Sequence, residues 1–137
     1  MAEERPVRVL LVEDPPEQGE ASLETLAGEG HDLIASDDLV QALHIARALH
    51  PDVIVLDVTF PGAGGLSSLR RLRADRGLDA VPVVTLSSEA DDEEEALEAG
   101  AVVALHKPLR DGELNDAVVE ASANWLDLPR KRYWGGR

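Results

Sequence analysis

Residues 53–57 read Val-Ile-Val-Leu-Asp, and this stretch decides the fold that we predict for the chain. Four consecutive large apolar residues are typical of a short strand buried on both faces of a parallel sheet. The run ends on the carboxylate of Asp57, which must lie where the strand emerges, because an unpaired buried carboxylate is very costly. In an open α/β sheet, ligands bind at the carboxyl ends of the strands. Asp57 is therefore expected at the ligand-binding edge of a sheet.

Further short apolar segments alternate with helical patterns on both sides of this strand. This alternation predicts an α/β fold, a doubly wound five-stranded parallel sheet with five helices on its two faces. Asp37 is the predicted cap of the second helix. The predicted strands are 5–12, 31–36, 53–57, 82–86 and 101–105, and the predicted helices are about 15–29, 37–50, 66–78, 89–98 and 109–128.

Composition narrows the classes of partner. The 137 residues predict one domain over residues 5–128, followed by a flexible basic tail at 129–137. A formal net charge of −14 argues against a nucleic acid partner, since phosphate binding needs clustered Lys and Arg. No apolar run approaches the roughly 18 residues of a membrane span, and the acidic N-terminus lacks a signal-peptide core. These two features predict that the protein does not enter the membrane, and the absence of cysteine agrees with the cytoplasmic location that we expect.

Most of the predicted strands end on side chains that can do chemistry, and a doubly wound sheet brings these ends together along one edge. The set contains carboxylates, one hydroxyl and one ammonium. Carboxylates that share a pocket repel one another, so one would take up a proton unless a cation joined them. The residues of this set are Glu13, Asp14, Asp57, Ser87 and Lys107.

The ligand types in this set indicate a magnesium site. Hard oxygen ligands without His or Cys favour Mg²⁺, which one or two carboxylates hold together with waters and phosphate oxygens. Asp14 and Asp57 are the expected direct ligands. Glu13 is expected to act through water, and the carbonyl of Thr59 is a further candidate ligand.

With a metal and a lysine present, an oxygen of Asp57 can attack phosphorus and become an aspartyl phosphate. Mg²⁺, the Lys107 ammonium and the Ser87 hydroxyl would then face the phosphoryl oxygens. These groups neutralise the charge of the transferring group, which is most of what phosphoryl-transfer catalysis requires.

From about residue 8 to about residue 121, the chain resembles the receiver domain of bacterial two-component response regulators. Each matching motif is weak alone, and their order and spacing together make the resemblance specific. The motifs are V-L-L-V-E-D at 9–14, P-D-V-I-V-L-D at 51–57, P-G at 61–62, G-L at 65–66, V-P-V-V-T-L-S at 81–87, A-G-A at 99–101 and K-P at 107–108.

The resemblance implies a flavodoxin-like, chemotaxis-regulator-like sheet of order 2-1-3-4-5. It implies that Asp57 is the phospho-acceptor, that Glu13 and Asp14 are the acidic pair, that Ser87 is the switch hydroxyl and that Lys107 contacts the phosphate. It also implies a sensor histidine kinase or a histidine phosphotransfer protein as donor, and a Lys107–Pro108 peptide bond that is often cis. Such a phosphoprotein is not an enzyme for another substrate, because it assists only its own phosphorylation and dephosphorylation.

The sequence departs from the family pattern at the predicted output side. Ala104 stands where the family often has an aromatic residue in the fifth strand, so that form of switching is absent. Gly64 replaces an acid or asparagine, and Pro15-Pro16 follow the acidic pair. The helix at 89–98 is rich in acids and poor in apolar residues, so we expect it to be weakly held. A downstream protein target would read residues 89–128, and we expect a monomer or a weak dimer.

Several alternatives stay open at this point. Asp14 could cap the first helix, with Glu17 completing a capping box, and Ser87 could cap the fourth. The whole chain could be a pseudo-receiver that binds partners without phosphorylation. It could also be a Mg²⁺-dependent phosphatase with an aspartate nucleophile, although those enzymes have a second Asp where this chain has Thr59.

Overall fold

A five-stranded, fully parallel sheet forms the centre of the molecule, and its strand order is β2-β1-β3-β4-β5. The computed structural model describes residues 7–12, 26–36, 38–57, 65–88 and 90–124. The predicted fold class and strand order are therefore confirmed. The strands are β1 Arg8–Val12, β2 Asp32–Ser36, β3 Val53–Asp57, β4 Val83–Ser87 and β5 Val103–His106.

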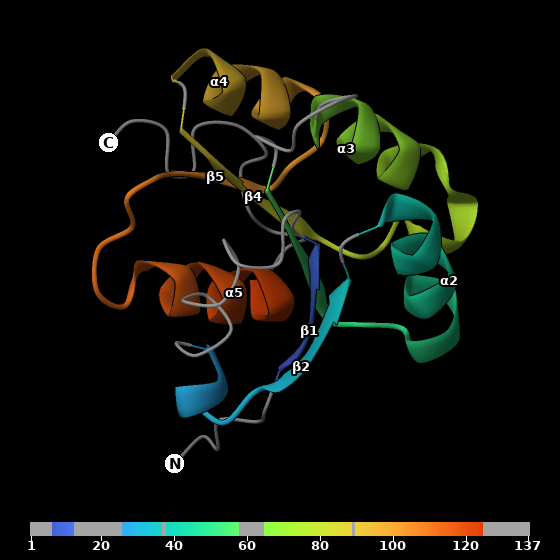
Figure 1. Cartoon of the computed structure of the whole chain (residues 1–137), viewed down its shortest axis with the longest axis horizontal. Coiled ribbons are helices and arrows are strands. Elements are labelled where there is room, and N and C mark those ends of the chain that lie inside the picture. Colours follow the sequence, from blue (N-terminus) through green and yellow to red (C-terminus); the bar gives the residue numbers. More distant parts are fainter. Residues whose placement is uncertain (1–6, 13–25, 37, 58–64, 89, 125–137) are drawn as a thin grey trace.

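Helices cover both faces of this sheet. Figure 1 shows α5 on one side of the sheet and α2, α3 and α4 on the other. The order of the elements explains this arrangement, since right-handed crossovers place successive helices on one face until the strand order reverses. The helices are α2 Leu39–Leu49, α3 Gly65–Ala74, the 3-10 helix η1 Arg76–Leu78, α4 Ala90–Glu98 and α5 Glu113–Asn124, and residues 26–28 are also helical.

The strand alternation divides the core into two clusters. In β3, Val53 and Val55 face the cluster beneath α5, whereas Ile54 and Leu56 face the cluster beneath α2, α3 and α4. All four side chains are fully buried, as expected for a central strand covered on both faces. The helices complete the clusters with Ala117 and Val118 from α5, Ala42 and Leu43 from α2, Leu69 and Leu72 from α3, and Ala96 from α4.

Two helix starts differ from the prediction. The residue that caps α2 is Asp38 rather than Asp37, because the Asp38 carboxylate accepts a hydrogen bond from the backbone N–H of Gln41. The final helix begins at Glu113, about four residues after the predicted start. Gly112 has a φ of 81°, a left-handed conformation that suits glycine and separates the preceding loop from the helix.

Some predictions fall outside the described residues. These are the acidic pair Glu13 and Asp14, the carbonyl ligand Thr59, most of the first predicted helix, and the tail at 129–137. Within the described ranges, each helix is too short or too polar to reach across a lipid bilayer.

Candidate functional site

The carboxylate of Asp57 lies at the carboxyl end of β3, in the centre of the sheet. β3 runs between β1 and β4, and Asp57 is in register with Leu86 of β4. Only 1% of the residue is exposed. A carboxylate this deep requires a compensating charge or hydrogen bonds, so its partners define the site.

Lys107 supplies such a charge. Its Nζ donates a hydrogen bond to Oδ2 of Asp57 at 2.5 Å. The Lys107 side chain is 27% exposed and that of Asp57 is 2% exposed. The lysine is therefore partly accessible to solvent, whereas the carboxylate that it contacts is buried. The Lys107–Pro108 peptide bond is cis, as the resemblance implied.

Ser87 ends the neighbouring strand, β4, and only 1% of it is exposed. Its backbone carbonyl accepts a hydrogen bond of 2.7 Å from the backbone N–H of Lys107. The ends of β4 and β5 are thereby held together immediately beside the Lys107–Asp57 contact. Of the residues predicted for the site, the structure brings Asp57 and Lys107 into direct contact and ties Ser87 to Lys107 through the backbone.

The predicted metal ligands are represented here by Asp57 alone, since Glu13, Asp14 and Thr59 lie outside the described residues. In the part of the chain that the structure describes, no group of three or more His, Cys, Asp or Glu side chains is placed to hold a metal ion. The chemistry of Asp57 nevertheless fits Mg²⁺, because a carboxylate supplies the hard oxygen donors that this ion prefers.

This arrangement can support nucleophilic chemistry at a carboxylate oxygen. Asp57 is surrounded by apolar strands, where electrostatic interactions are stronger than in water. A positive charge fixed beside it stabilises negative charge that develops on an incoming group without rearrangement of solvent. The same edge could therefore bind and stabilise a transferring anionic group.

Sequence reasoning missed one ion pair at this edge. Nδ1 of His106, the last residue of β5, contacts Oε2 of Glu93 on α4. The only sequence signal was the position of His106 directly before Lys107, because two residues on different elements carry no common spacing. Ala104, which stands at the departure from the family pattern, is 5% exposed and packs in the cluster beneath α2, α3 and α4.

The fold and this edge together define a class of protein: a doubly wound parallel sheet whose central strand ends on a buried carboxylate in contact with a lysine. The family model of the response regulator receiver domain matches residues 9–119. The chain belongs to this family of two-component signalling domains.

Curated relatives support the assignment. The chain is 40% identical over 109 residues to the DNA-binding response regulator MtrA of Mycolicibacterium smegmatis, a match that covers 78% of the chain and 46% of that protein. It is 41% identical over 105 residues to the transcriptional regulatory protein MalR of Bacillus subtilis, with 74% of the chain and 44% of MalR covered. The chain thus spans about half the length of the curated relatives it matches.

Solved structures agree on the fold. The receiver domain of the sensor histidine kinase PA1611 from Pseudomonas aeruginosa, which has a magnesium ion in its active site cleft, superimposes with a TM-score of 0.74 at 30% identity. That match covers 85% of this chain and 96% of the PA1611 domain. The chemotaxis response regulator CheY4 of Vibrio cholerae gives a TM-score of 0.72 at 25% identity, covering 82% and 96% of the two chains.

The relatives' names bear on one expectation from composition. MtrA is named as a DNA-binding protein, whereas the charge of this chain argues against a nucleic acid partner. The matched segment is 46% of MtrA, and the name does not say which part binds DNA. The expectation for this chain therefore stays a prediction.

Proposed function

We propose that Asp57 accepts a phosphoryl group from a sensor histidine kinase or a histidine phosphotransfer protein, in a step that requires Mg²⁺. The observation that carries this proposal is the 2.5 Å contact between Lys107 Nζ and Asp57 Oδ2 at the end of the central strand. On this proposal the chain acts only in its own phosphorylation and dephosphorylation and turns over no other substrate.

In the proposed step, a carboxylate oxygen of Asp57 forms a bond to phosphorus while the bond from phosphorus to the donor histidine nitrogen breaks. The electron pair of the broken bond stays on the imidazole nitrogen. On this proposal, the Lys107 ammonium would then face a phosphoryl oxygen, and the Ser87 hydroxyl would donate a hydrogen bond to another. This division of roles follows the general requirement for positioned positive charge and hydrogen bonds in phosphoryl transfer.

Mg²⁺, when bound, would neutralise charge on the transferring phosphoryl group. Asp57 and Asp14 would be direct ligands, Glu13 would act through water, and the Thr59 carbonyl would add an oxygen. The oxygen-only donor set supports this ion, and so does the magnesium found in the cleft of the PA1611 receiver domain.

We further propose that phosphorylation shifts the balance between two states of a surface within residues 89–128, which a downstream protein reads. The domain is taken as residues 5–128, with 129–137 as a tail. The family assignment supports this output, because the relatives that match are regulatory proteins.

The test is intact-mass analysis after incubation with acetyl phosphate and Mg²⁺, with Asp57→Ala as the matched control. We expect one phosphoryl group on the wild type, none on Asp57→Ala, and none on the wild type when EDTA is present during the reaction. A folded wild-type protein that gains no phosphoryl group would refute the proposal and favour partner binding without phosphorylation.

A further inference from the structure

The Glu93–His106 contact, a hydrogen bond that is also an ion pair when His106 is protonated, joins α4 to the end of β5 at the same edge as Asp57 and Lys107. The side chain of His106 is 48% exposed and that of Glu93 is 25% exposed, so the contact lies partly in solvent. It is one of three side-chain ion pairs within the described ranges, and the others are Lys107–Asp57 and Arg47–Asp75.

His106 and Lys107 are adjacent residues whose side chains contact different elements of the fold. His106 contacts Glu93 on α4, whereas Lys107 reaches Asp57. His106 is also in register with Ser87, whose carbonyl accepts the Lys107 N–H. The backbone at the end of β5 is therefore held from three directions.

We propose that Glu93 and His106 act as positioning residues for Lys107. Their ion pair fixes the backbone at the end of β5 from the α4 side and so fixes the direction in which the Lys107 ammonium approaches Asp57. This deepens the proposed function and rests on it, because the positioned ammonium is the group that would face the phosphoryl oxygens.

The packing of α4 supports such a role. Among the described side chains of α4, Ala96 is fully buried, Leu97 is partly buried, and Glu94, Glu95 and Glu98 are exposed. A helix with so few apolar anchors is held weakly by burial, so a polar link to β5 matters more here than on a well-packed helix. Because His106 contacts Glu93 and is adjacent to Lys107, a movement of α4 that shifts His106 would also shift the backbone of Lys107.

The first experiment compares Glu93→Gln with Glu94→Gln in the phosphoryl uptake assay with acetyl phosphate and Mg²⁺. Both substitutions remove one negative charge from α4, but only Glu93 contacts His106. We expect Glu93→Gln to slow uptake about threefold, the size expected for loss of a partly exposed ion pair, and Glu94→Gln to leave the rate unchanged. Equal slowing in both variants, or no slowing in Glu93→Gln, would overturn the proposal.

A double-mutant cycle tests whether the two residues act as a pair. His106→Gln alone is expected to slow uptake about as much as Glu93→Gln, and the double variant is expected to be no slower than either. Slowing that multiplies in the double variant would show independent effects and would contradict the pairing. Thermal unfolding of each variant confirms that it is folded.

Hydrogen exchange at the Lys107 amide provides a readout that does not depend on phosphorylation. The Lys107 N–H bonds to the Ser87 carbonyl, so looser positioning should raise its exchange rate. We expect faster exchange in Glu93→Gln and wild-type exchange in Glu94→Gln. If the wild type accepts no phosphoryl group, the proposed function fails while this measurement still decides the inference: unchanged exchange in Glu93→Gln would overturn it.

Discussion

Two carboxylates in this molecule make contacts of the same length with a cation, yet they belong to different kinds of site. Asp57 lies 2.5 Å from Lys107 at the carboxyl end of β3. Asp75 lies 2.5 Å from Arg47. In the sequence, Asp75 is the residue between the end of α3 and the start of η1. The Asp57 side chain is 2% exposed, whereas that of Asp75 is 13% exposed and faces an arginine that is 50% exposed.

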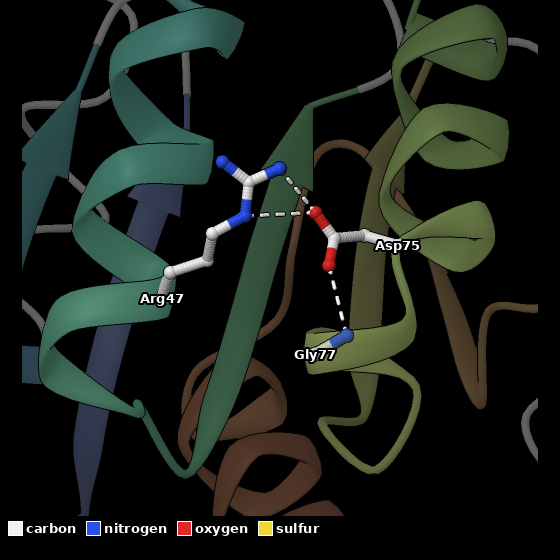
Figure 2. A network of polar contacts seen from close by, with 3 residues as sticks. All are labelled: Arg47, Asp75 and Gly77. Carbon is white, nitrogen blue, oxygen red and sulfur yellow. Dashed lines mark hydrogen bonds and ion pairs between the residues drawn. The ribbon is translucent and has the colours of Figure 1, made fainter.

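The difference lies in what surrounds each carboxylate. Figure 2 shows Asp75 between Arg47 of α2 and the backbone N–H of Gly77. One oxygen accepts from Nε and Nη2 of Arg47, and the other accepts from Gly77 at 2.9 Å. The hydrogen bond from Arg47 is the main reason that the pKa of Asp75 lies below its usual value. Burial opposes this lowering, and the Gly77 N–H and the charge of Arg47 add to it. Asp75 is thus satisfied by permanent groups and anchors α2 to the segment before β4.

Asp57, by contrast, is paired with a lysine at the carboxyl ends of the strands, which is the edge where α/β sheets generally bind ligands. An ion pair at 2.5 Å can therefore be an anchor or a poised reactive group, and the distance alone does not separate them. Perturbations of the two sites should have different signs and different readouts.

The largest expected effect is on phosphoryl uptake in Lys107→Met. Removing one preorganised donor from a site where charge develops typically costs about 10²-fold in rate, and we expect a loss of this size with acetyl phosphate and Mg²⁺. The initial rate is measured by intact mass at several donor concentrations.

Arg110→Met is the matched control for that experiment. Arg110 is exposed and lies three residues further along the chain, so its replacement removes the same charge from the same region. We expect its uptake rate to match the wild type. Equal losses in both variants would mean that net charge, not the Lys107–Asp57 contact, sets the rate.

The next largest effect is expected on the free energy of unfolding, for a substitution of Gly100 just before β5, at the edge of the sheet opposite the site. Gly100 has a φ of 116°, and a Cβ there would meet Cδ and Cγ of Arg73 at 2.6 and 2.7 Å. Arg73 cannot easily move, because its guanidinium donates to the carbonyls of Leu78 at 3.0 Å and Val81 at 2.5 Å. Gly100→Ala should therefore lower the free energy of unfolding by about 2–3 kcal/mol, from backbone strain plus the close contact.

Gly30→Ala separates the two causes in this prediction. Gly30 also has a positive φ, 87°, but a Cβ there meets nothing within 4 Å. Its replacement should cost only the backbone strain, about 1 kcal/mol. Urea denaturation of the two variants gives the difference, and equal losses would show that contact with Arg73 contributes nothing.

The comparison of the two carboxylates predicts opposite signs for Asp57→Asn and Asp75→Asn. Removing the charge of Asp57 relieves the cost of burying a carboxylate, and the Lys107 side chain, which is 27% exposed, can be hydrated once the pair is lost. We therefore expect the free energy of unfolding to rise by about 1 kcal/mol. Removing the charge of Asp75 loses the ion pair with Arg47 and weakens the cap on Gly77, so we expect it to fall. Urea denaturation at neutral pH measures both changes. Changes of the same sign would contradict the view that the charge of Asp75 stabilises the fold whereas the charge of Asp57 does not.

The sequence predicted the fold and a common edge for Asp57 and Lys107 for a physical reason. The apolar run at 53–57 and the polar group at each strand end are local patterns, and a parallel sheet converts them into a common edge. That logic places Asp57 and Lys107 together. It cannot find the contacts of Glu93 with His106 or of Arg47 with Asp75, because each depends on how two separate elements pack.

The predictions of two helix starts were wrong for a related reason. Asp37 and Asp38 are adjacent candidates for the cap of α2, and only the backbone conformation at Asp38, with φ of −143° and ψ of 128°, decides between them. The left-handed Gly112 likewise delays α5 to Glu113. Such choices rest on single dihedral angles that hydrophobic spacing does not encode.

The smallest expected effect is the acid dependence of stability that Asp75 contributes. Because the pKa of Asp75 is lower in the folded protein than the usual value of about 3.9, the folded state binds this proton more weakly than the unfolded state. The stabilisation is therefore complete above the unfolded pKa and is lost as the pH falls through the folded pKa. We expect the stability difference between the wild type and Asp75→Asn to be constant from about pH 6 to about pH 5 and to shrink below about pH 4. Urea denaturation of both proteins across this range measures it, and subtracting the two removes the titration of the other carboxylates. A difference that stays constant down to about pH 3 would mean that Arg47 contributes no charge-dependent stability, and Asp75 would then act only as a hydrogen-bonding cap.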